Sequence, residues 1–366
     1  MAGPQITVTP QMANQNDPNR KVKIGWVGCG FIGQVAHLVN YLDIPNAEIV
    51  ALADLRPDLG AQVCHRYNIP RFYSDHNALL EDPEIDAVVA VVRRHHTASV
   101  ALDVLKSGKH LFAEKPMAPT FAQAEPLALA AKENQLCYSI GFMRRHDEGV
   151  QTAKRMLDEV LESGELGALL YLRSYCFAGG DYCNISGYIK TDEPAPNHMI
   201  APIAPDWLPD DKHKDYEHFL NVCSHTLNLV RYLTGKRPSV SHVEYRRPAG
   251  GVVVMDFGEY PGVLEFCDIS QNRWVEGVEI FFERGSLHLE LPPAFLRNQP
   301  AQVRMYKETV NGPSQTVVSN PNWTWSFRRE DEAFIQDILT GQTPVASGAD
   351  SLEDHILIEE IWQHLA

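Results

Sequence analysis

Two side chains that could carry acid–base chemistry lie four residues apart in NVCSHTLNLV, residues 221–230. Asn221 and His225 would share one face of a helix, because residues four apart are one turn from each other. Asn228 extends the same polar stripe. A histidine can accept or release a proton near neutral pH. Such a stripe among apolar neighbours is either a hydrogen-bonded structural network or the wall of an active site, and the segment alone leaves both readings open.

A second candidate site is the glycine-rich segment VGCGFIG, residues 27–33. It follows a predicted strand and opens a predicted helix, which is the context in which a GxGxxG pattern binds a dinucleotide. Its glycines allow a tight turn and a close approach of the backbone to a pyrophosphate, and the helix N-terminus offers free N–H groups to the anion. The cofactor contacts expected from this loop are Gly28, Gly30, Phe31, Ile32 and Gly33.

An acidic residue is expected about twenty positions after such a loop, at the end of the second strand. Asp54 occupies that position at the end of EIVALAD. Its carboxylate would bind the ribose hydroxyls of adenosine and repel a 2′-phosphate, which favours NAD over NADP. Arg56, two residues later, weakens that exclusion and is counted among the cofactor contacts.

The composition is that of an ordinary globular protein, with 44% hydrophobic and 22% charged residues in 366. A formal net charge of −15 speaks against binding to nucleic acid or to an anionic membrane, since both require a basic surface. The seven cysteines are scattered without a CxxC pair, and no histidine or cysteine spacing indicates a metal site. We therefore expect a cytoplasmic protein with reduced thiols, no metal and no membrane span.

Strands and helices alternate in the first part of the chain. Predicted strands lie at 21–28, 48–54, 87–92, 110–115 and 137–142, and predicted helices separate the first four at 32–42, 59–67 and 98–108. This order predicts a parallel sheet with right-handed crossovers. After a helix at 149–164, seven β-rich runs joined by Gly, Pro and Asn turns predict an open antiparallel sheet of about six strands, and two helices end the chain.

The predicted fold class is α/β. An N-terminal arm would occupy residues 1–20, a Rossmann dinucleotide-binding domain residues 21–144, and an α/β domain for substrate binding and oligomerisation residues 145–366. Residues 178–217 show little periodicity and are rich in Pro, Asp, Tyr and His. A segment of that length is either a binding loop or a plain surface insertion.

The segment GKHLFAEKP, with Glu114, Lys115 and Pro116, resembles the EKP motif of the glucose–fructose oxidoreductase, inositol dehydrogenase and rhizopine-catabolism (Gfo/Idh/MocA) family. The resemblance extends over nearly the whole chain from Lys21 and includes SIGFMRRHD and NVCSHTLNLVRYLTG. It implies a Rossmann domain, a second α/β domain whose open sheet forms a homodimer or homotetramer, and an NAD or NADP cofactor. It also implies oxidation or reduction at a sugar or cyclitol carbon.

By the same resemblance, Lys115 corresponds to the active-site lysine of the family, and His225 to the histidine of its helix motif. Asn221 stands where many members have aspartate, and Glu114 joins the cofactor contacts. The peptide bond before Pro116 is a natural place for a cis bond. The segment VVRRHHTA departs from the family pattern, so either His96 or Thr97 takes the nicotinamide-side contact. In an extended segment, His95 and His96 would face opposite sides.

Oxidation of a secondary alcohol removes a hydroxyl proton and a hydride. His225 is the expected base and Lys115 the cation that stabilises a developing alkoxide, although a desolvated lysine could exchange roles with it. Asn221 would position the substrate. The expected substrate contacts are Arg144, Arg145, Tyr182, Lys190, Asn221 and His225, with Arg273 and Trp274 as weaker candidates.

Three functions remain open on this basis. The first is an NAD-dependent dehydrogenase of a sugar, cyclitol or glycoside. The second is an NAD-dependent glycosidase that oxidises the ring, eliminates the aglycone, adds water and reduces the ring again, acting on a neutral or an anionic glycoside of sulfo or uronic type. The third is a non-catalytic NAD sensor, which would not need Lys115, Asn221 and His225.

Overall fold

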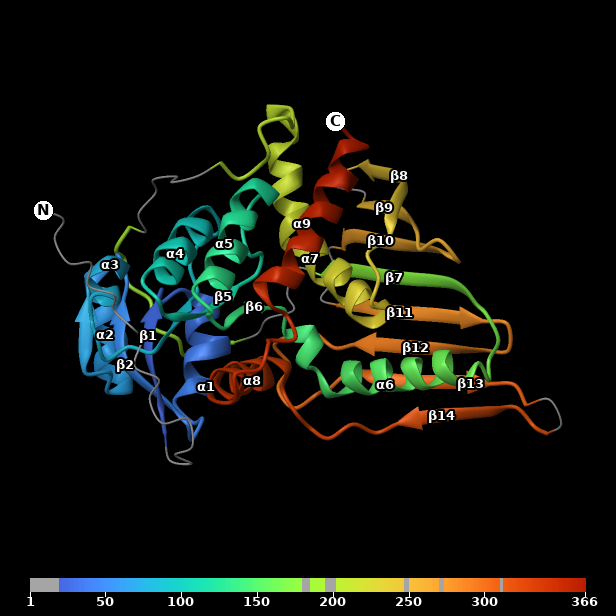
Figure 1. Cartoon of the computed structure of the whole chain (residues 1–366), viewed down its shortest axis with the longest axis horizontal. Coiled ribbons are helices and arrows are strands. Elements are labelled where there is room, and N and C mark those ends of the chain that lie inside the picture. The colour runs from blue at the N-terminus through green and yellow to red at the C-terminus, as the bar shows by residue number, and fades with distance from the viewer. Residues whose placement is uncertain (1–19, 180–184, 195–201, 247–249, 270–272, 310–311) are drawn as a thin grey trace, which may run out of the picture.

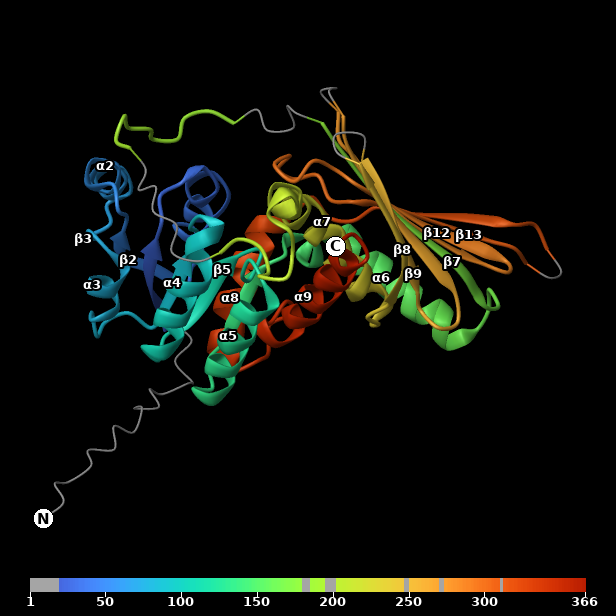
Figure 2. The same ribbon diagram turned by 90° about the horizontal axis from the view of Figure 1, so that it is seen from above.

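The computed structural model describes residues 20–179, 185–194, 202–246, 250–269, 273–309 and 312–366. The N-terminal arm predicted at residues 1–20 lies almost wholly outside this range. Within it, no helix is both long enough and apolar enough to cross a bilayer. Figures 1 and 2 show two sheets side by side, with helices between them and around the first sheet.

The first sheet has six parallel strands in the order β3-β2-β1-β4-β5-β6. The order reverses direction between β1 and β4, which is the switch point at which Rossmann folds bind dinucleotides. Its strands are β1 (Val22–Val27), β2 (Ala47–Ala53), β3 (Arg71–Tyr73), β4 (Ala87–Ala90), β5 (His110–Glu114) and β6 (Tyr138–Gly141).

Helices cover both faces of this sheet (Figure 2). Fully buried Trp26 and Phe112 lie in the core on one of these faces. The helical elements of this part are η1 (Gly33–Leu38, a π-helical turn), α1 (Val39–Tyr41), α2 (Pro57–Tyr67), α3 (His76–Leu80), α4 (Arg94–Lys106) and α5 (Phe121–Glu133).

The second sheet has eight strands in the order β14-β13-β12-β11-β7-β10-β9-β8. All neighbours are antiparallel except β7 and β10, which run parallel at the centre. Its strands are β7 (Leu169–Gly179), β8 (Ser239–Arg246), β9 (Gly250–Asp256), β10 (Pro261–Ile269), β11 (Val275–Phe282), β12 (Gly285–Leu291), β13 (Gln302–Lys307) and β14 (Gln315–Ser319).

Helices α6 (Glu148–Ser163), α7 (His213–Thr234) and α9 (Gly348–Gln363) lie on one face of this sheet (Figure 2). Their apolar sides form one core with the sheet, in which Phe219, Leu227 and Trp362 are fully or almost fully buried. The helical elements are η2 (Met143–His146), α6 (Glu148–Ser163), η3 (Asp210–Lys212), α7 (His213–Thr234), α8 (Ser326–Thr340) and α9 (Gly348–Gln363).

The predicted fold class is confirmed, with differences in detail. The second sheet has eight strands rather than about six, with β14 as a strand that was not predicted, and its central pair β7 and β10 is parallel instead of antiparallel. In the first part, α5 and the short β3 carry too little periodicity to predict. Helix α7 begins at His213, so the end of the predicted loop 178–217 is helical. Helix α8 contributes Phe334 and Ile335 to the core of the first sheet. The boundary at residue 144 stays a prediction.

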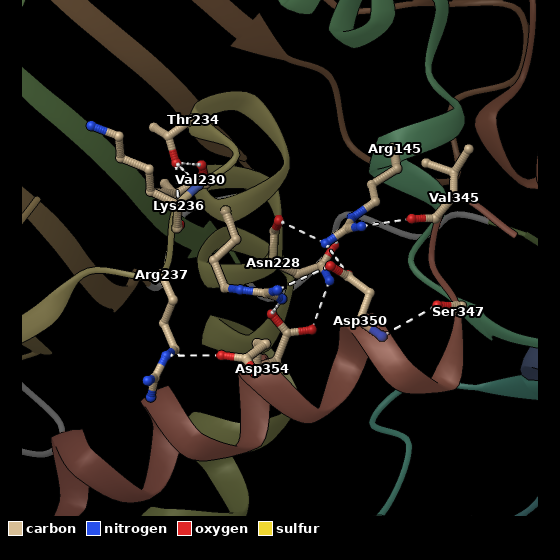
Figure 3. Close-up of polar contacts among 12 residues, drawn as sticks. Arg145, Asn228, Val230, Thr234, Lys236, Arg237, Val345, Ser347, Asp350 and Asp354 are labelled. Atoms are coloured by element: carbon tan, nitrogen blue, oxygen red, sulfur yellow. Dashed lines mark hydrogen bonds and ion pairs between the residues drawn. The ribbon is translucent and has the colours of Figure 1, made fainter. Parts of the chain in front are cut away.

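A buried polar network fixes α7 against α9 and the turn after β6 (Figure 3). Asn228 of α7 accepts a hydrogen bond from Arg145 Nε at 2.7 Å and donates one to Asp354 Oδ2 of α9 at 2.7 Å. Arg231, one turn further along α7, donates to Asp354 Oδ1 at 2.7 Å. The third residue of the polar stripe is therefore structural.

Replacing Asp354 by alanine should lower the free energy of unfolding by about 2 kcal/mol or more, because it leaves the buried amide nitrogen of Asn228 without its acceptor and removes one of the two carboxylates paired with Arg231. Urea denaturation measures this change. The matched control is Glu353→Ala on the same helix, which removes a half-exposed ion pair with Arg237 and should cost no more than about 1 kcal/mol. Equal effects of the two substitutions would contradict the structural role of Asp354.

Candidate functional site

A large cavity of about 1210 Å³ opens between the two sheets. It is bigger than the roughly 300–1,000 Å³ of most small-molecule sites, so it has room for a dinucleotide and a second ligand. One wall consists of residues at the carboxyl ends of β1, β2, β4 and β5, which is where open α/β sheets bind ligands. The other wall consists of α7 and the strands β7, β10 and β11.

The glycine loop has the geometry that a pyrophosphate requires. Gly28 has φ +95°, and a Cβ there would collide with the carbonyl oxygen of Val91. A Cβ on Gly33 would lie 2.9 Å from the carbonyl oxygen of Gly28. At Gly30, by contrast, no protein atom lies within 4 Å of the Cβ position, so the loop leaves space there on the cavity side. Phe31 and Ile32 line the same cavity.

Asp54 lies at the end of β2, buried and facing the loop. Its Oδ2 accepts a hydrogen bond from Cys29 N at 2.6 Å, which ties the strand to the glycine loop. Arg56 donates to the same carboxylate from Nε at 2.9 Å and from Nη2 at 3.0 Å. The arginine predicted to weaken the exclusion of NADP is therefore paired with Asp54.

Lys115 and Asn221 meet across the cavity. Lys115 Nζ donates to the backbone carbonyl of Asn221 at 2.8 Å and to its Oδ1 at 3.3 Å. The peptide bond between Lys115 and Pro116 is cis, as expected. Burial lowers the pKa of Lys115 to about 8, with Glu114 opposing that shift and Arg94 adding to it. The lysine is therefore able to exchange a proton near neutral pH.

His225 lines the same cavity one turn along α7 from Asn221. Its ring packs edge-on against Phe142, with centroids 6.0 Å apart. Burial holds its pKa well below 6.5, and the charges of Lys115 and Arg144 lower it further. Its Nδ1 has no hydrogen-bond partner among the described residues. His225 is thus neutral at pH 7 and a weak base.

Glu114 serves mainly to hold the EKP segment. Its Oε2 accepts from Lys115 N at 2.9 Å, and its Oε1 lies 3.0 Å from His37 Nε2. The other nitrogen of His37 lies 2.8 Å from Asp331 Oδ1 of α8. Glu330 also lies beside His37 and Glu114, but both ring nitrogens of His37 already have carboxylate partners. His37, Glu114 and Asp331 thus form a buried ionic network, and burial raises the pKa of the adjacent Glu330 carboxyl well above its usual value.

The expectation that His95 and His96 face opposite sides was wrong. Helix α4 begins at Arg94, so the pair is helical rather than extended. Consecutive side chains on a helix point about 100° apart, and the two rings lie 4.6 Å apart, both lining the cavity. Thr97, the alternative to His96, is buried and donates to the carbonyl of Arg93 at 3.3 Å, away from the cavity wall.

The predicted substrate residues do not all lie in the cavity wall. Arg144 lines the cavity, but it is ion-paired with buried Glu276, which also accepts from the indole of Trp274 at 2.7 Å. Arg145 does not line the cavity: the network of Figure 3 uses its guanidinium, which corrects the prediction that it contacts substrate. Lys190 is exposed, outside the cavity wall.

Lys190 Nζ lies instead over the ring of Tyr188, 4.6 Å from its centroid, which likewise corrects its predicted role. Tyr182 lies outside the described residues. Arg273 is exposed and does not line the cavity, whereas Trp274 does.

Two polar pairs in the cavity wall were not predicted. Arg94 Nη2 lies 3.4 Å from Glu217 Oε1, and His218 Nε2 lies 2.9 Å from Asp268 Oδ2. Each pair joins segments at least 50 residues apart in sequence. Periodicity describes single elements, so nothing in the sequence pattern marks these contacts.

Comparison with known proteins identifies the first domain. The model of the oxidoreductase family with an NAD-binding Rossmann fold, GFO_IDH_MocA, matches residues 22–142. The myo-inositol 2-dehydrogenase of Thermotoga maritima is 24% identical over 90% of this chain and 92% of its own. Other curated relatives, among them further inositol dehydrogenases, are matched over only 43–54% of their own length.

Solved structures confirm the fold over nearly the whole chain. Levoglucosan dehydrogenase in complex with NADH and levoglucosan has a TM-score of 0.73 at 19% identity, covering 94% of this chain and 97% of that one. The 3-ketoreductase KijD10 from Actinomadura kijaniata in complex with NADP has a TM-score of 0.71 at 20% identity, covering 94% and 98%. At these identities the similarity establishes the fold alone.

The substitution Gly30→Ala should weaken dinucleotide binding at least about tenfold without unfolding the protein. Its methyl group meets no protein atom but enters the space beside the loop where the pyrophosphate would lie. Titration calorimetry with NAD measures the affinity, and the melting temperature checks the fold. Gly164→Ala is the control for the loss of a glycine outside the cavity: Gly164 ends α6 with φ +66°, so this substitution should lower the melting temperature but leave the affinity for NAD unchanged. Unchanged affinity in Gly30→Ala would contradict the assignment of the loop.

Proposed function

We propose that the chain is an NAD-dependent dehydrogenase of the Gfo/Idh/MocA oxidoreductase family, whose model matches its Rossmann domain at residues 22–142. Its substrate would be a sugar or cyclitol with a free secondary hydroxyl. The observation that carries the proposal is the meeting of Lys115, Asn221 and His225 in one cavity with the glycine loop. Relatives named as inositol and levoglucosan dehydrogenases support the substrate class.

The residues present fit a dinucleotide. Gly28, Gly30 and the start of η1 would hold the pyrophosphate, and Asp54 the adenosine ribose, in which case its pairing with Arg56 would have to loosen or be shared. His95 and His96 line the same wall further along, after β4. When bound, the nicotinamide supplies the hydride acceptor. Asp54 favours NAD over NADP by repelling a 2′-phosphate.

The electrostatics favour Lys115 rather than His225 as the proton acceptor. A general base works best when its pKa is near the operating pH, and burial brings the pKa of Lys115 to about 8. His225 has its pKa lowered well below 6.5, so it would act as a neutral hydrogen-bond partner of the substrate hydroxyl. Asn221 holds Lys115 through its backbone carbonyl and leaves its amide N–H groups for the substrate.

The cavity favours an uncharged substrate. Two of its arginines are matched by carboxylates, Arg144 by Glu276 and Arg94 by Glu217. His218 also has a carboxylate neighbour, Asp268. With Arg145 and Lys190 elsewhere, the residues first considered for an anionic sugar do not provide a free cation in the cavity. Hydroxyl groups can instead share the polar atoms of these pairs, as is usual in sugar sites.

The second domain also supports association of the protein with itself. The face of the second sheet turned away from the helices carries no described helix (Figure 2). Leu170 and Tyr306, from strands of this sheet, are large and exposed, and apolar surface of this kind is commonly covered by a partner. We propose a homodimer or homotetramer formed through this face.

Purified protein with NAD should reduce the cofactor stoichiometrically when given myo-inositol or another uncharged polyol or anhydrosugar. Absorbance of NADH and release of the aglycone from aryl glycosides are followed side by side, with uronic acids as the charged set. NAD-dependent aglycone release without accumulated NADH would replace the proposal by the glycosidase alternative. Binding of NAD with no turnover of any of these compounds would favour a sensor.

The pH dependence should identify the base. With Lys115 as acceptor, kcat/KM for the alcohol should rise with pH and level off above about pH 8, because the neutral amine is the active form. Lys115→Met should lower kcat by roughly 10²–10⁴-fold and remove this rise. His225→Gln should lower the activity but retain the rise of kcat/KM with pH. A rise that is complete below pH 6.5 and absent in His225→Gln would show that His225 is the base.

A further inference from the structure

The segment that follows β7 of the second sheet lies against the Rossmann domain. Residues 185–194 run past α2 (Figure 2). Ile189 exchanges two hydrogen bonds with the side chain of Gln34: its N–H donates to Oε1 at 2.9 Å, and its carbonyl accepts from Nε2 at 3.0 Å. Arg66 of α2 donates to the carbonyl of Gly187 at 2.7 Å. We call residues 185–194 the strap.

The strap ends in a carboxylate that caps α2. Glu193 Oε1 accepts from Asp58 N at 2.9 Å, and Oε2 accepts from Leu59 N at 2.8 Å. The hydroxyl of Thr191 donates to the same oxygen at 3.0 Å, which holds the carboxylate in place. The residue before α2, Arg56, provides no side-chain cap of its own. The first N–H groups of this helix therefore obtain their acceptor from a residue more than 130 positions away.

This corner of the Rossmann domain otherwise has the parts of a phosphate site. Arg56 follows Asp54 at the end of β2, and an arginine near this position accommodates the 2′-phosphate in NADP-binding relatives of the fold. The free N–H groups at the start of α2 would add two more anion donors. In this protein both sets of donors are occupied by carboxylates: the guanidinium by Asp54 and the helix N-terminus by Glu193.

Glu193 also lies within electrostatic reach of Arg56. The pKa of the guanidinium is raised, first by its hydrogen bond to Asp54 and to a smaller extent by the charge of Glu193. The two carboxylates thus flank one arginine, and the local charge is negative overall. A phosphate dianion arriving here would meet two like charges and would have to displace at least one of them from its donors.

We propose that Glu193 is a cofactor-specificity residue that, together with Asp54, excludes the 2′-phosphate of NADP. The proposal rests on the dinucleotide site of the proposed function. It differs from the usual arrangement because the second carboxylate comes from the other half of the chain. Cofactor choice is thereby tied to docking of the strap, and Glu193 would contribute little to the binding of NAD, which lacks the phosphate.

The test is a comparison of NAD and NADP affinities in Glu193→Gln by titration calorimetry. Glutamine removes the charge and keeps an oxygen acceptor for one of the two N–H groups of α2. The affinity for NADP should rise about tenfold or more, while that for NAD changes by less than about threefold. Asp192→Asn is the matched control: it removes the same charge from the neighbouring exposed residue, and it should leave the NADP-to-NAD ratio as in the parent protein.

The outcomes separate the two proposals. An unchanged ratio in Glu193→Gln, or an equal rise in Asp192→Asn, overturns the role of Glu193 even though NAD still binds. Equal loss of both affinities would mean that Glu193 only supports the structure, and this too overturns the proposal. Failure of the parent protein to bind NAD would overturn the proposed function itself. Glu193→Ala, which also removes the cap, should raise NADP affinity in the same direction if charge is the cause.

Discussion

The hydrogen bond from Lys115 Nζ to the backbone carbonyl of Asn221 is the contact on which the site depends. It joins the carboxyl end of β5 in the Rossmann sheet to α7, which packs on the second sheet. The main-chain acceptor, at 2.8 Å, is closer than the side-chain oxygen, at 3.3 Å. The helix backbone therefore positions the amine, and the side-chain amide of Asn221 remains available to bind a ligand.

Because the amine is placed by a helix, the helix itself must be held firmly. Asn221, His225 and Asn228 form one stripe along α7, but they have different surroundings. The first two face the cavity, and Asn228 is bound between Arg145 and Asp354. The same face of one helix therefore contains both its functional groups and its anchor. The structural interpretation holds for Asn228, whereas Asn221 and His225 line the cavity and their part in catalysis stays a proposal.

Features with a local period could be predicted from the sequence. The parallel sheet, the glycine loop, Asp54 and the open second sheet follow from strand and helix patterns and from turn residues. The meeting of Lys115 with Asn221 could be anticipated only through the family resemblance, since 106 positions separate them. Arg145 illustrates the limit: an arginine after a central strand can face a cavity or a buried carboxylate, and only the packed structure determines which.

The prediction for the start of α4 was wrong for a different reason. RRHH, residues 93–96, follows a buried strand: Arg93 is the N-cap and makes no side-chain capping hydrogen bond, and Arg94 begins the helix. Helix starts are predicted mainly from Ser, Thr, Asp or Asn at that position. In their absence the strand was extended too far, and the two histidines were assigned to opposite sides when both line the cavity.

The network behind Glu114 explains how Lys115 can lose its proton so near a carboxylate. Glu114 precedes the lysine directly and, alone, would hold it charged. Burial would lower the pKa of His37, but Asp331 and Glu114 outweigh that effect and raise it well above 6.5, so the imidazole is protonated between two carboxylates. Glu114 is thus paired with His37, and desolvation together with the charge of Arg94 outweighs the field of Glu114 at Lys115. Asp331 belongs to α8, whose Phe327 also lines the cavity, so a helix near the end of the chain helps to hold the carboxylate that precedes the lysine.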